Sequence, residues 1–303
     1  MSRLAGIGFI AGATGCFALM DSATKAVSIV APMMMALALR NGLQAALVAG
    51  TLLPRRGLAL LRTRRPLLQL LRGLMLLGCS GTAFMAVQVM PIAEFTAIVL
   101  LTPLALTALA AWREGRRDGQ RVGARQWTLV LGGFVGALLI VRPSAGGGRA
   151  LASGIGLPLA IIVVNTAYQW LTALLAWQED AGTLQLWTAG TGLAVSAVAL
   201  PFVWTALPAW AWGLLVLLAA LATLAHGLLI LAYRHAPVAV LSPYLYLQIA
   251  YATLGGWLFF GQWPDARAAA GIALIAACGA AGTRLAGAAP RSSSSTSSTA
   301  KEA

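Results

Sequence analysis

The apolar residues of this chain fall into blocks of about 20 residues, separated by short segments rich in proline, glycine and arginine. An α-helix needs about 20 apolar residues to cross the ~30 Å hydrocarbon core of a bilayer. Hydrophobic residues make up 59% of the chain and charged residues only 10%, whereas about 25% of the residues of a soluble domain are charged. The pattern therefore predicts a helical protein that crosses the membrane many times.

Ten such blocks fit into the 303 residues and leave no room for a separate soluble domain. The predicted fold class is an all-α polytopic membrane protein with about ten transmembrane helices. Prolines between the blocks mark helix ends, because proline lacks an N–H group and disfavours helix in the residue before it. The expected spans are Leu4–Val30, Met33–Leu53, Leu67–Val89, Phe95–Trp112, Trp127–Val141, Leu151–Trp177, Leu184–Trp204, Trp210–Tyr233, Val238–Phe260 and Ala266–Leu285.

The net charge of +13 is concentrated in alternate loops, chiefly those after the second and fourth spans. Lys and Arg collect on the cytoplasmic side of membrane proteins, so these loops and both chain ends are expected on that side. The expected membrane is a bacterial inner membrane. The basic residues lie between apolar blocks without interleaved aromatic residues, which argues against a nucleic-acid partner. The three cysteines lie inside apolar blocks, so the sequence predicts neither a metal site nor a cofactor.

Short motifs recur in the same order in the two halves of the chain. The motif GIG at residues 6–8 returns at 154–156, and MPIA at 90–93 is echoed by APVA at 236–239. Five spans followed by five spans means that the second copy enters the membrane from the opposite side, the inverted-repeat arrangement of many secondary transporters. The expected units are repeats over residues 1–145 and 151–286, followed by a disordered Ser/Thr-rich tail over 287–303.

Further residues of the spans match a known family. They are Asp21-Ser22-Ala23-Thr24-Lys25, Arg40, Met90-Pro91-Ile92-Ala93 before Leu101-Thr102-Pro103, Trp112-Arg113-Glu114, Trp127 with Leu131-Gly132 and Gly136, and Pro237-Val238-Ala239 with Gly261-Gln262. On these residues the chain resembles the EamA-type members of the drug/metabolite transporter superfamily, over nearly its whole length. The resemblance implies two inverted five-helix repeats that transport a small metabolite. Gln262 departs from the family, which often has Glu there, and this puts a role for charge at that position in doubt.

Charged side chains within a span cost about 3 kcal/mol or more, so they usually face an interior cavity and have a partner. Asp21 and Lys25 lie four residues apart in the first span, on one helix face. They form either a self-neutralising structural pair or part of the substrate path. Arg40 in the second span can clamp a carboxylate with two parallel hydrogen bonds. Its alternative role is that of a structural partner for Asp21 or Glu94.

Three groups are candidates for carrying a coupling proton: Asp21, Glu94 and His226. Glu94, at the start of the fourth span, either favours the positive helix N-terminus or titrates outside the membrane. His226 lies within the eighth span, and histidine side chains titrate near neutral pH. The alternative for His226 is a neutral ring bonded to a neighbouring helix. Arg72, near the start of the third span, is expected to snorkel to the cytoplasmic surface.

Two spans each carry a stripe of aromatic and amide side chains. The second stripe recurs at i, i+4 and i+7, one face of a helix, and Pro243 before it can free a backbone carbonyl. The stripes either bond helices together or point at a shared cavity. We expect them to bind substrate together with Asp21, Lys25 and Arg40, whereas Gly132 and Gly136 form a small-xxx-small pair for helix packing. The stripes are Asn165, Tyr168 and Gln169, and Tyr244, Gln248 and Tyr251.

The sequence predicts a secondary transporter and not an enzyme, because no nucleotide-binding loop and no hydrolytic set of residues is present. Charges of both signs in the expected pocket suit a small polar amphoteric metabolite, such as an amino-acid derivative, moved by alternating access. The resemblance favours export and admits an opine-type metallophore as substrate. The alternative is import of a vitamin or nucleoside-like metabolite, of the riboflavin or S-adenosylmethionine type. A membrane-embedded enzyme or a non-transporting scaffold is disfavoured, and a homodimer is compatible with the sequence, although no motif requires one.

Overall fold

The computed structural model describes residues 3–89, 101–117, 123–141, 156–260 and 264–288, and every regular element within these ranges is helical. The short helices are η1 (Gly57–Leu61), α10 (Leu200–Val203), α12 (Val238–Leu241) and η2 (Ser242–Tyr246). The ten long helices within the same ranges are α1 (Arg3–Val27), α2 (Met33–Arg56), α3 (Pro66–Val89), α5 (Thr102–Arg117), α6 (Ala124–Val141), α8 (Gly156–Ala176), α9 (Ala181–Ala197), α11 (Ala209–His235), α13 (Leu247–Phe260) and α14 (Ala266–Ala288). The all-α prediction is confirmed, and the long helices follow the ten expected spans.

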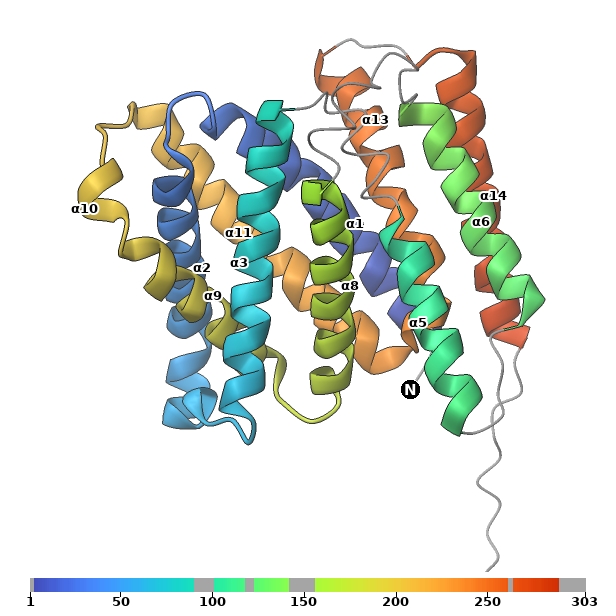
Figure 1. Cartoon of the computed structure of the whole chain (residues 1–303), viewed down its shortest axis with the longest axis horizontal. Helices are drawn as coiled ribbons and strands as arrows, with labels where there is room; N and C mark the ends of the chain where they lie inside the picture. Colours follow the sequence, from blue (N-terminus) through green and yellow to red (C-terminus); the bar gives the residue numbers. More distant parts are fainter. Residues whose placement is uncertain (1–2, 90–100, 118–122, 142–155, 261–263, 289–303) are drawn as a thin grey trace, which may run out of the picture.

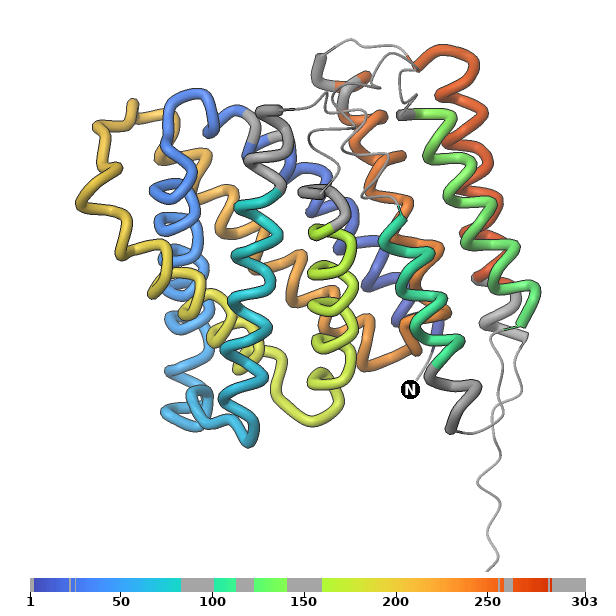
Figure 2. Tube along the Cα trace, in the orientation of Figure 1, coloured from blue at the N-terminus to red at the C-terminus, as the bar shows by residue number. Residues whose placement is uncertain are grey.

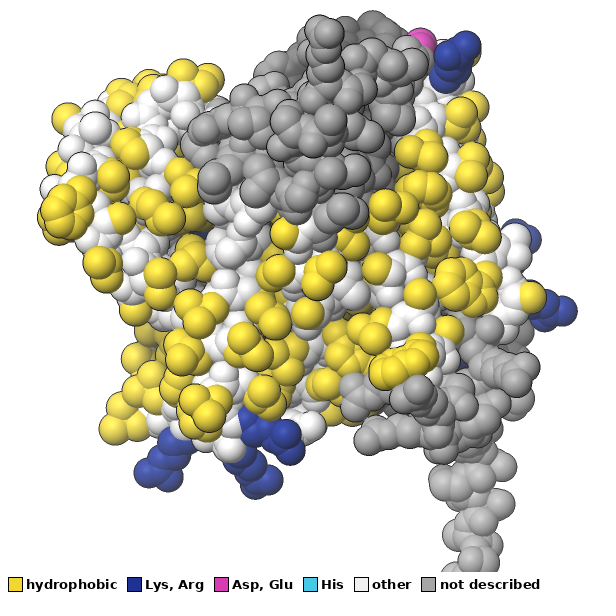
Figure 3. All heavy atoms as spheres, in the orientation of Figure 1, with side chains coloured by type: hydrophobic (Ala, Val, Ile, Leu, Met, Phe, Trp, Pro, Cys, Tyr) yellow, Lys and Arg dark blue, Asp and Glu magenta, His cyan; other side chains and the backbone are white. Residues whose placement is uncertain are grey.

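The lengths and compositions of these helices fit a bilayer. Among the described residues, four helical stretches are long and apolar enough to cross a membrane: Arg3–Asp21, Met33–Leu61, Ala209–His235 and Val238–Gly255. Large hydrophobic side chains point outward, and Phe202 is 86% exposed. Figure 3 shows hydrophobic side chains spread over the visible face, with Lys and Arg at its edges, several of them at the lower one. The chain is a polytopic membrane protein.

The main helix contacts join the N-terminal half of the chain to the C-terminal half. Helix α1 packs along α11, α3 along α8, α2 along α9, and α6 along α14 (Figure 1). Figure 2 shows the same mixing of early and late segments, with the green trace of α6 beside the red trace of α14. The first two contacts pair the first long helix of one half with the third of the other, and the last two pair equivalent helices. The set of contacts is therefore unchanged when the two halves are exchanged.

The contact between α6 and α14 is a close approach of two backbones. A Cβ atom added to Gly136 would lie 2.8 Å from the carbonyl oxygen of Gly271, and one added to Gly271 would lie 2.5 Å from the carbonyl oxygen of Gly136. One turn earlier, a Cβ atom added to Gly132 would lie 2.6 Å from Sγ of Cys278. These distances are too short for a side chain. The prediction that Gly132 and Gly136 serve helix packing is confirmed.

The expected span Leu184–Trp204 is shorter than predicted, because proline ends it. Helix α9 ends at Ala197, and a new short helix, α10, carries Pro201 in its first turn. A proline ring clashes with the carbonyl group four residues earlier, which here belongs to Ala197. The helix also begins before the predicted start, because the Asp180 carboxylate accepts a hydrogen bond from the N–H of Gly182 over 2.9 Å.

The expected span Val238–Phe260 is divided at Pro243 into α12, η2 and α13. Pro243 has no N–H group to donate to the carbonyl of Ala239, four residues earlier. The side-chain amide of Gln126 in α6 donates to that carbonyl instead. The predicted freeing of a backbone carbonyl is confirmed, and the structure identifies the side chain that binds it.

Some predicted features lie outside the described residues. They are Glu94, the motif at 90–93, the start of the sixth span, Gln262 and the tail from residue 289. Lys25 lies near the end of α1, but its side chain is also outside the described part.

Candidate substrate site

Polar side chains gather where α2, α3, α8 and α11 meet inside the bundle. In a bilayer, a polar group without a hydrogen-bond partner costs several kcal/mol, so each of these groups needs a partner in the protein, in water or in a ligand. Gln69 and Arg72 of α3 are buried, as are Tyr168 and Gln169 of α8 and His226 of α11, while Arg40 of α2 is half-buried. We call these residues the central polar cluster: Arg40, Gln69, Arg72, Tyr168, Gln169 and His226.

Arg72 is held inside the bundle by two neighbouring helices. Its side chain is only 1% exposed. Its guanidinium group donates to the carbonyl of Leu184 in α9 and to Oγ1 of Thr172 in α8, the latter over 3.4 Å, and lies 5.9 Å from the centre of the Tyr168 ring. The prediction that Arg72 snorkels to the surface is wrong, because the face of α3 that bears it packs against α8 and α9.

Arg40, half-buried in α2, is the second arginine of the central polar cluster. Its Nη2 donates to Oδ1 of the adjacent Asn41 over 3.3 Å, and its Nε is buried without a hydrogen-bond partner among the described residues. The guanidinium group lies within electrostatic range of Tyr168 and of His226. Asp21 is not among its described electrostatic partners. The described residues therefore show no contact for the predicted alternative, in which Arg40 is a structural partner of Asp21.

The stripe on α8 faces α3 and α11. The hydroxyl of Tyr233 in α11 donates to Oε1 of Gln169 over 2.6 Å, and Nε2 of Gln169 donates to Oδ1 of Asn165 over 3.4 Å. Tyr168 is 3% exposed and lies under the guanidinium group of Arg72. Asn165, Tyr168 and Gln169 therefore lie in one region, and two of their polar groups already bond neighbouring side chains.

His226 is buried beside α1. Its Nδ1 bonds the carbonyl of Ala222 in its own helix over 2.8 Å, and its ring meets Phe17 edge-on with ring centres 5.1 Å apart. The ring is thus oriented by its own helix and by an aromatic neighbour. The predicted bond to a neighbouring helix is replaced by this aromatic contact.

Asp21 belongs to a second group, between α1 and α13. The amide Nε2 of Gln248 donates to Oδ2 of Asp21 over 2.7 Å. Further along the same contact, a Cβ atom added to Gly15 would lie 3.7 Å from the Tyr251 ring. Gln248 and Tyr251 therefore both lie against α1, where Asp21 is exposed.

Tyr244 does not share that face. It lies in η2, before the backbone returns to α-helical geometry at Leu247, and its hydroxyl donates to the carbonyl of Gly279 in α14 over 3.0 Å. The predicted single stripe of Tyr244, Gln248 and Tyr251 is thus divided. The break at Pro243 rotates Tyr244 toward α14 and away from the α1 contact.

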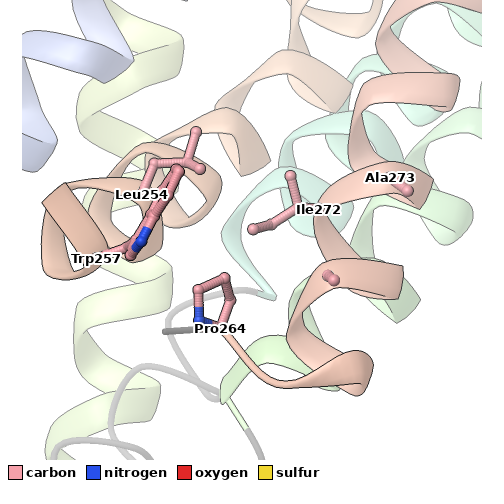
Figure 4. A pocket seen from close by; sticks show the side chains of 6 residues that line it. Leu254, Trp257, Pro264, Ile272 and Ala273 are labelled. Carbon is pink, nitrogen blue, oxygen red and sulfur yellow. The ribbon is translucent and has the colours of Figure 1, made fainter. Parts of the chain in front are cut away.

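A cavity of about 290 Å³ lies between α13 and α14 (Figure 4). It is lined by Leu254, Trp257, Pro264, Ala269, Ile272 and Ala273. None of these residues is a predicted site residue, and the lining is almost wholly apolar. A polar solute would lose its hydrogen bonds there, so the cavity is not a candidate site for one.

At the arginine-rich end of the bundle, the loop before α3 holds the loop before α9. The Glu179 carboxylate accepts hydrogen bonds from the hydroxyl of Thr63 over 2.8 Å and from the N–H of Arg64 over 2.9 Å. Arg56 and Asp180 form an ion pair beside them. We call these five residues the loop clasp. It ties the N-terminal half of the chain to the C-terminal half.

Asp180 is the charged centre of the loop clasp. Partial burial raises the pKa of its carboxyl group, but hydrogen bonds from Arg56 and from the Gly182 N–H, with the charges of Arg56 and Arg234, together lower the pKa below its ordinary value of 3.8. Arg234 also donates to the carbonyls of Ala176 and Glu179. Asp180 therefore stays ionised at neutral pH.

Over 238 residues the chain is 32% identical to a protein named riboflavin transporter from Rhizobium johnstonii, an alignment that covers 74% of this chain and 72% of the relative. The chain belongs to the same family of membrane transporters. It is also 26% identical over 267 residues to the pseudopaline exporter CntI of Pseudomonas aeruginosa, covering 86% of this chain and 90% of the relative. No family model matches the chain.

A solved crystal structure shares the fold of this transporter. The superposition covers 94% of this chain and 99% of the solved chain, with a TM-score of 0.78 and 22% sequence identity. At this identity the likeness shows the fold alone.

Three polar residues of the transporter's interior were not predicted as site residues. Gln69 and Arg72 lie three residues apart in an otherwise apolar span, and this spacing places both on one helix face. Gln185 of α9 lies against α11, where a Cβ atom added to Gly227 would be 2.8 Å from its Nε2. The spacing of Gln69 and Arg72 is a signal that sequence reasoning could have used.

Proposed function

We propose that this membrane protein is a secondary transporter that moves a small polar metabolite by alternating access, with the central polar cluster as its substrate site. The two proposed repeats, residues 1–145 and 151–286, would move against each other around this cluster. The resemblance to the EamA-type drug/metabolite transporters agrees with this arrangement.

The observation that carries the proposal is the exchange of helix contacts between the halves. The contact of α1 with α11 has its counterpart in that of α3 with α8, and α2 meets α9 as α6 meets α14. Such a pattern is expected of two copies related by a pseudo-two-fold axis in the membrane plane. The central polar cluster draws its residues from helices of both halves, which is where such transporters bind substrate.

For the substrate we propose an amphoteric, amino-acid-derived metabolite, moved outward. The relationship to the pseudopaline exporter, along 90% of its length, supports export. The second candidate is import of riboflavin or a similar compound, which the 32% identity to the riboflavin transporter favours. Arg40, Tyr168 and Gln169 are the proposed substrate contacts for either one.

For the coupling ion we propose a proton. Asp21 is the acidic residue described inside a predicted span. Its carboxylate accepts a hydrogen bond from the neutral amide of Gln248, and no ion pair with a described cation accompanies it. A carboxylate in such a setting can bind and release a proton as the helices around it move. Glu94 and His226 are the other candidates.

The test is solute exchange by purified protein in liposomes, with labelled riboflavin and a labelled N-carboxyalkyl amino acid in parallel. We expect exchange of one of the two, and faster net movement when a pH gradient is imposed. Asp21→Asn should abolish the effect of the gradient while preserving exchange, because the amide cannot carry a proton. Asp265→Asn is the matched control, since Asp265 caps α14 by accepting from the N–H of Ala268. The proposal is overturned if the protein exchanges neither of these two solutes nor any compound related to them.

A further inference from the structure

The central polar cluster contains more positive than negative charge. Arg40 and Arg72 both lie within electrostatic range of Tyr168, and Arg72 lies over its ring, 5.9 Å from the ring centre. The described salt bridge of Arg56 with Asp180 lies elsewhere, in the loop clasp. Asp21, the acidic residue described inside a predicted span, accepts a hydrogen bond from Gln248 between α1 and α13. Neither arginine of the cluster has a described carboxylate partner.

Several polar atoms of the cluster are also left without a hydrogen bond. They are Nε of Arg40, Nε of Arg72, and both amide atoms of Gln69, each buried without a partner among the described residues. Gln69 is fully buried at 0% exposure, one turn from Arg72 on the same helix. Buried polar side chains are hydrogen-bonded in the large majority of cases, so these unpaired groups need an explanation.

We propose that the central polar cluster is an anion subsite, in which Arg40, Arg72 and Gln69 bind the ionised acidic group of the transported solute. The inference rests on the proposed transport function and narrows its substrate class to compounds that carry a carboxylate or a similar anion. A guanidinium group binds a carboxylate through two parallel hydrogen bonds, and Nε is one of the donors for that geometry. The amide of Gln69 supplies a further donor.

Charge and desolvation both favour this occupant. Two guanidinium groups removed from water without a counter-charge are costly, and an entering anion offsets that cost. A neutral amide of the same shape carries no charge and does not offset this cost. The guanidinium carbon of Arg72 lies 5.9 Å from the centre of the Tyr168 ring, a cation–π contact that helps to hold the side chain in place. The subsite therefore discriminates by charge before it discriminates by shape.

The test measures binding to the purified full-length protein in detergent, read as the shift of its thermal unfolding midpoint with solute concentration. The probes are matched pairs: succinate and succinamide, benzoate and benzamide, iminodiacetate and iminodiacetamide, at constant ionic strength. We expect at least one carboxylate to raise the midpoint and its amide to leave it unchanged. Arg40→Gln and Arg72→Gln should each weaken the apparent affinity about tenfold or more, the loss expected for a charged hydrogen bond.

The control is Arg55→Gln, which removes one positive charge from an exposed position at the end of α2 and should leave the affinity unchanged. If Arg72→Gln does not fold, Arg40→Gln decides alone, because Arg40 makes one hydrogen bond, to its neighbour Asn41, among those described. The subsite is overturned if no carboxylate raises the midpoint, if the amides act equally, or if the arginine variants bind as well as the parent.

This outcome is separate from that of the transport assay. Exchange of a neutral solute in liposomes, without any carboxylate binding, would keep the transporter and overturn the anion subsite. Carboxylate binding that depends on both arginines, without exchange of any solute, would keep the subsite and overturn the proposed function.

Discussion

At the scale of single residues, the hydroxyl of Tyr233 decides whether a buried amide in the central polar cluster is satisfied. It donates to Oε1 of Gln169 over 2.6 Å, and Tyr233 is only 1% exposed. We predict that Tyr233→Phe lowers stability by about 1–3 kcal/mol, because it leaves the Gln169 oxygen buried without a donor. Thermal unfolding of the purified protein in detergent measures the loss.

The double variant Tyr233→Phe with Gln169→Leu tests that cause. Removing both partners should cost less than the sum of the two single changes, because neither polar group is then left alone. Additive losses would show that the hydrogen bond contributes nothing.

Arg72 shows why residue composition alone did not locate the polar cluster. An arginine six residues into its helix can extend its guanidinium group to water at the membrane surface, or it can donate hydrogen bonds to acceptors inside the bundle. The choice depends on which face of α3 meets α8 and α9, and this is a property of the packed bundle. The stripe on α8 was predicted correctly as a unit, because its spacing is set by one regular helix.

At the scale of whole elements, the break at Pro243 depends on a side chain from another helix. The carbonyl of Ala239, freed by Pro243, is bound by the amide of Gln126. We predict that Gln126→Leu costs about 1–3 kcal/mol, since a buried carbonyl loses its donor. Adding Pro243→Ala should recover part of this loss, because an alanine N–H can donate to the same carbonyl. Unfolding midpoints of the two variants measure the recovery, and no recovery would contradict the pairing.

The contact of α6 with α14 gives a second prediction for an element. Gly136→Ala should lower stability by about 2 kcal/mol or more, because its Cβ atom would lie 2.8 Å from the carbonyl oxygen of Gly271 and force the helices apart. Gly213→Ala is the matched control in α11. Nothing lies within 4 Å of a Cβ atom there, so alanine should raise helix stability by up to about 1 kcal/mol. Equal effects at both positions would contradict the close approach.

The apolar blocks predicted the order of the helices, but they did not predict the breaks within two of these blocks. Pro201 and Pro243 both lie inside apolar blocks, and proline is tolerated in membrane helices when neighbours satisfy the freed groups. Whether a proline ends a helix, as before α10, or changes it to a tighter turn, as in η2, depends on those neighbours. For this reason the face of Tyr244 was predicted wrongly, while Gln248 and Tyr251 were placed together.

At the scale of the whole molecule, the loop clasp holds the two halves together at one end. Asp180 has a lowered pKa in the folded state, so it contributes stability above its ordinary value of 3.8, and this is lost as the pH falls through the folded value below it. We predict that Asp180→Asn lowers the unfolding midpoint by a constant amount between about pH 8 and pH 5, and that the difference shrinks below about pH 4. A difference that persists in acid would assign the effect to the cap of α9 instead.

The overall architecture was accessible from sequence because bilayer thickness sets the length of each block. The two-half organisation remains a proposal that the exchange of helix contacts supports. The proposed site was accessible only in part, since Arg40, Tyr168 and Gln169 belong to the central polar cluster while Asp21 contacts Gln248 between α1 and α13. The order of helices along the chain does not determine which helices become neighbours in the bundle. The sequence therefore could not show that Asp21 and Arg40 belong to different groups.

The alternation of partners between the halves also has a consequence during synthesis. Helix α1 finds its main neighbour in α11, and α6 finds its own in α14, the final helix described. Helices that leave the ribosome early must therefore wait in the lipid with their packing faces uncovered until the late ones arrive. A chain cut short before α14 would leave α6 without its main neighbour, and the close glycine contact between the two helices could not form.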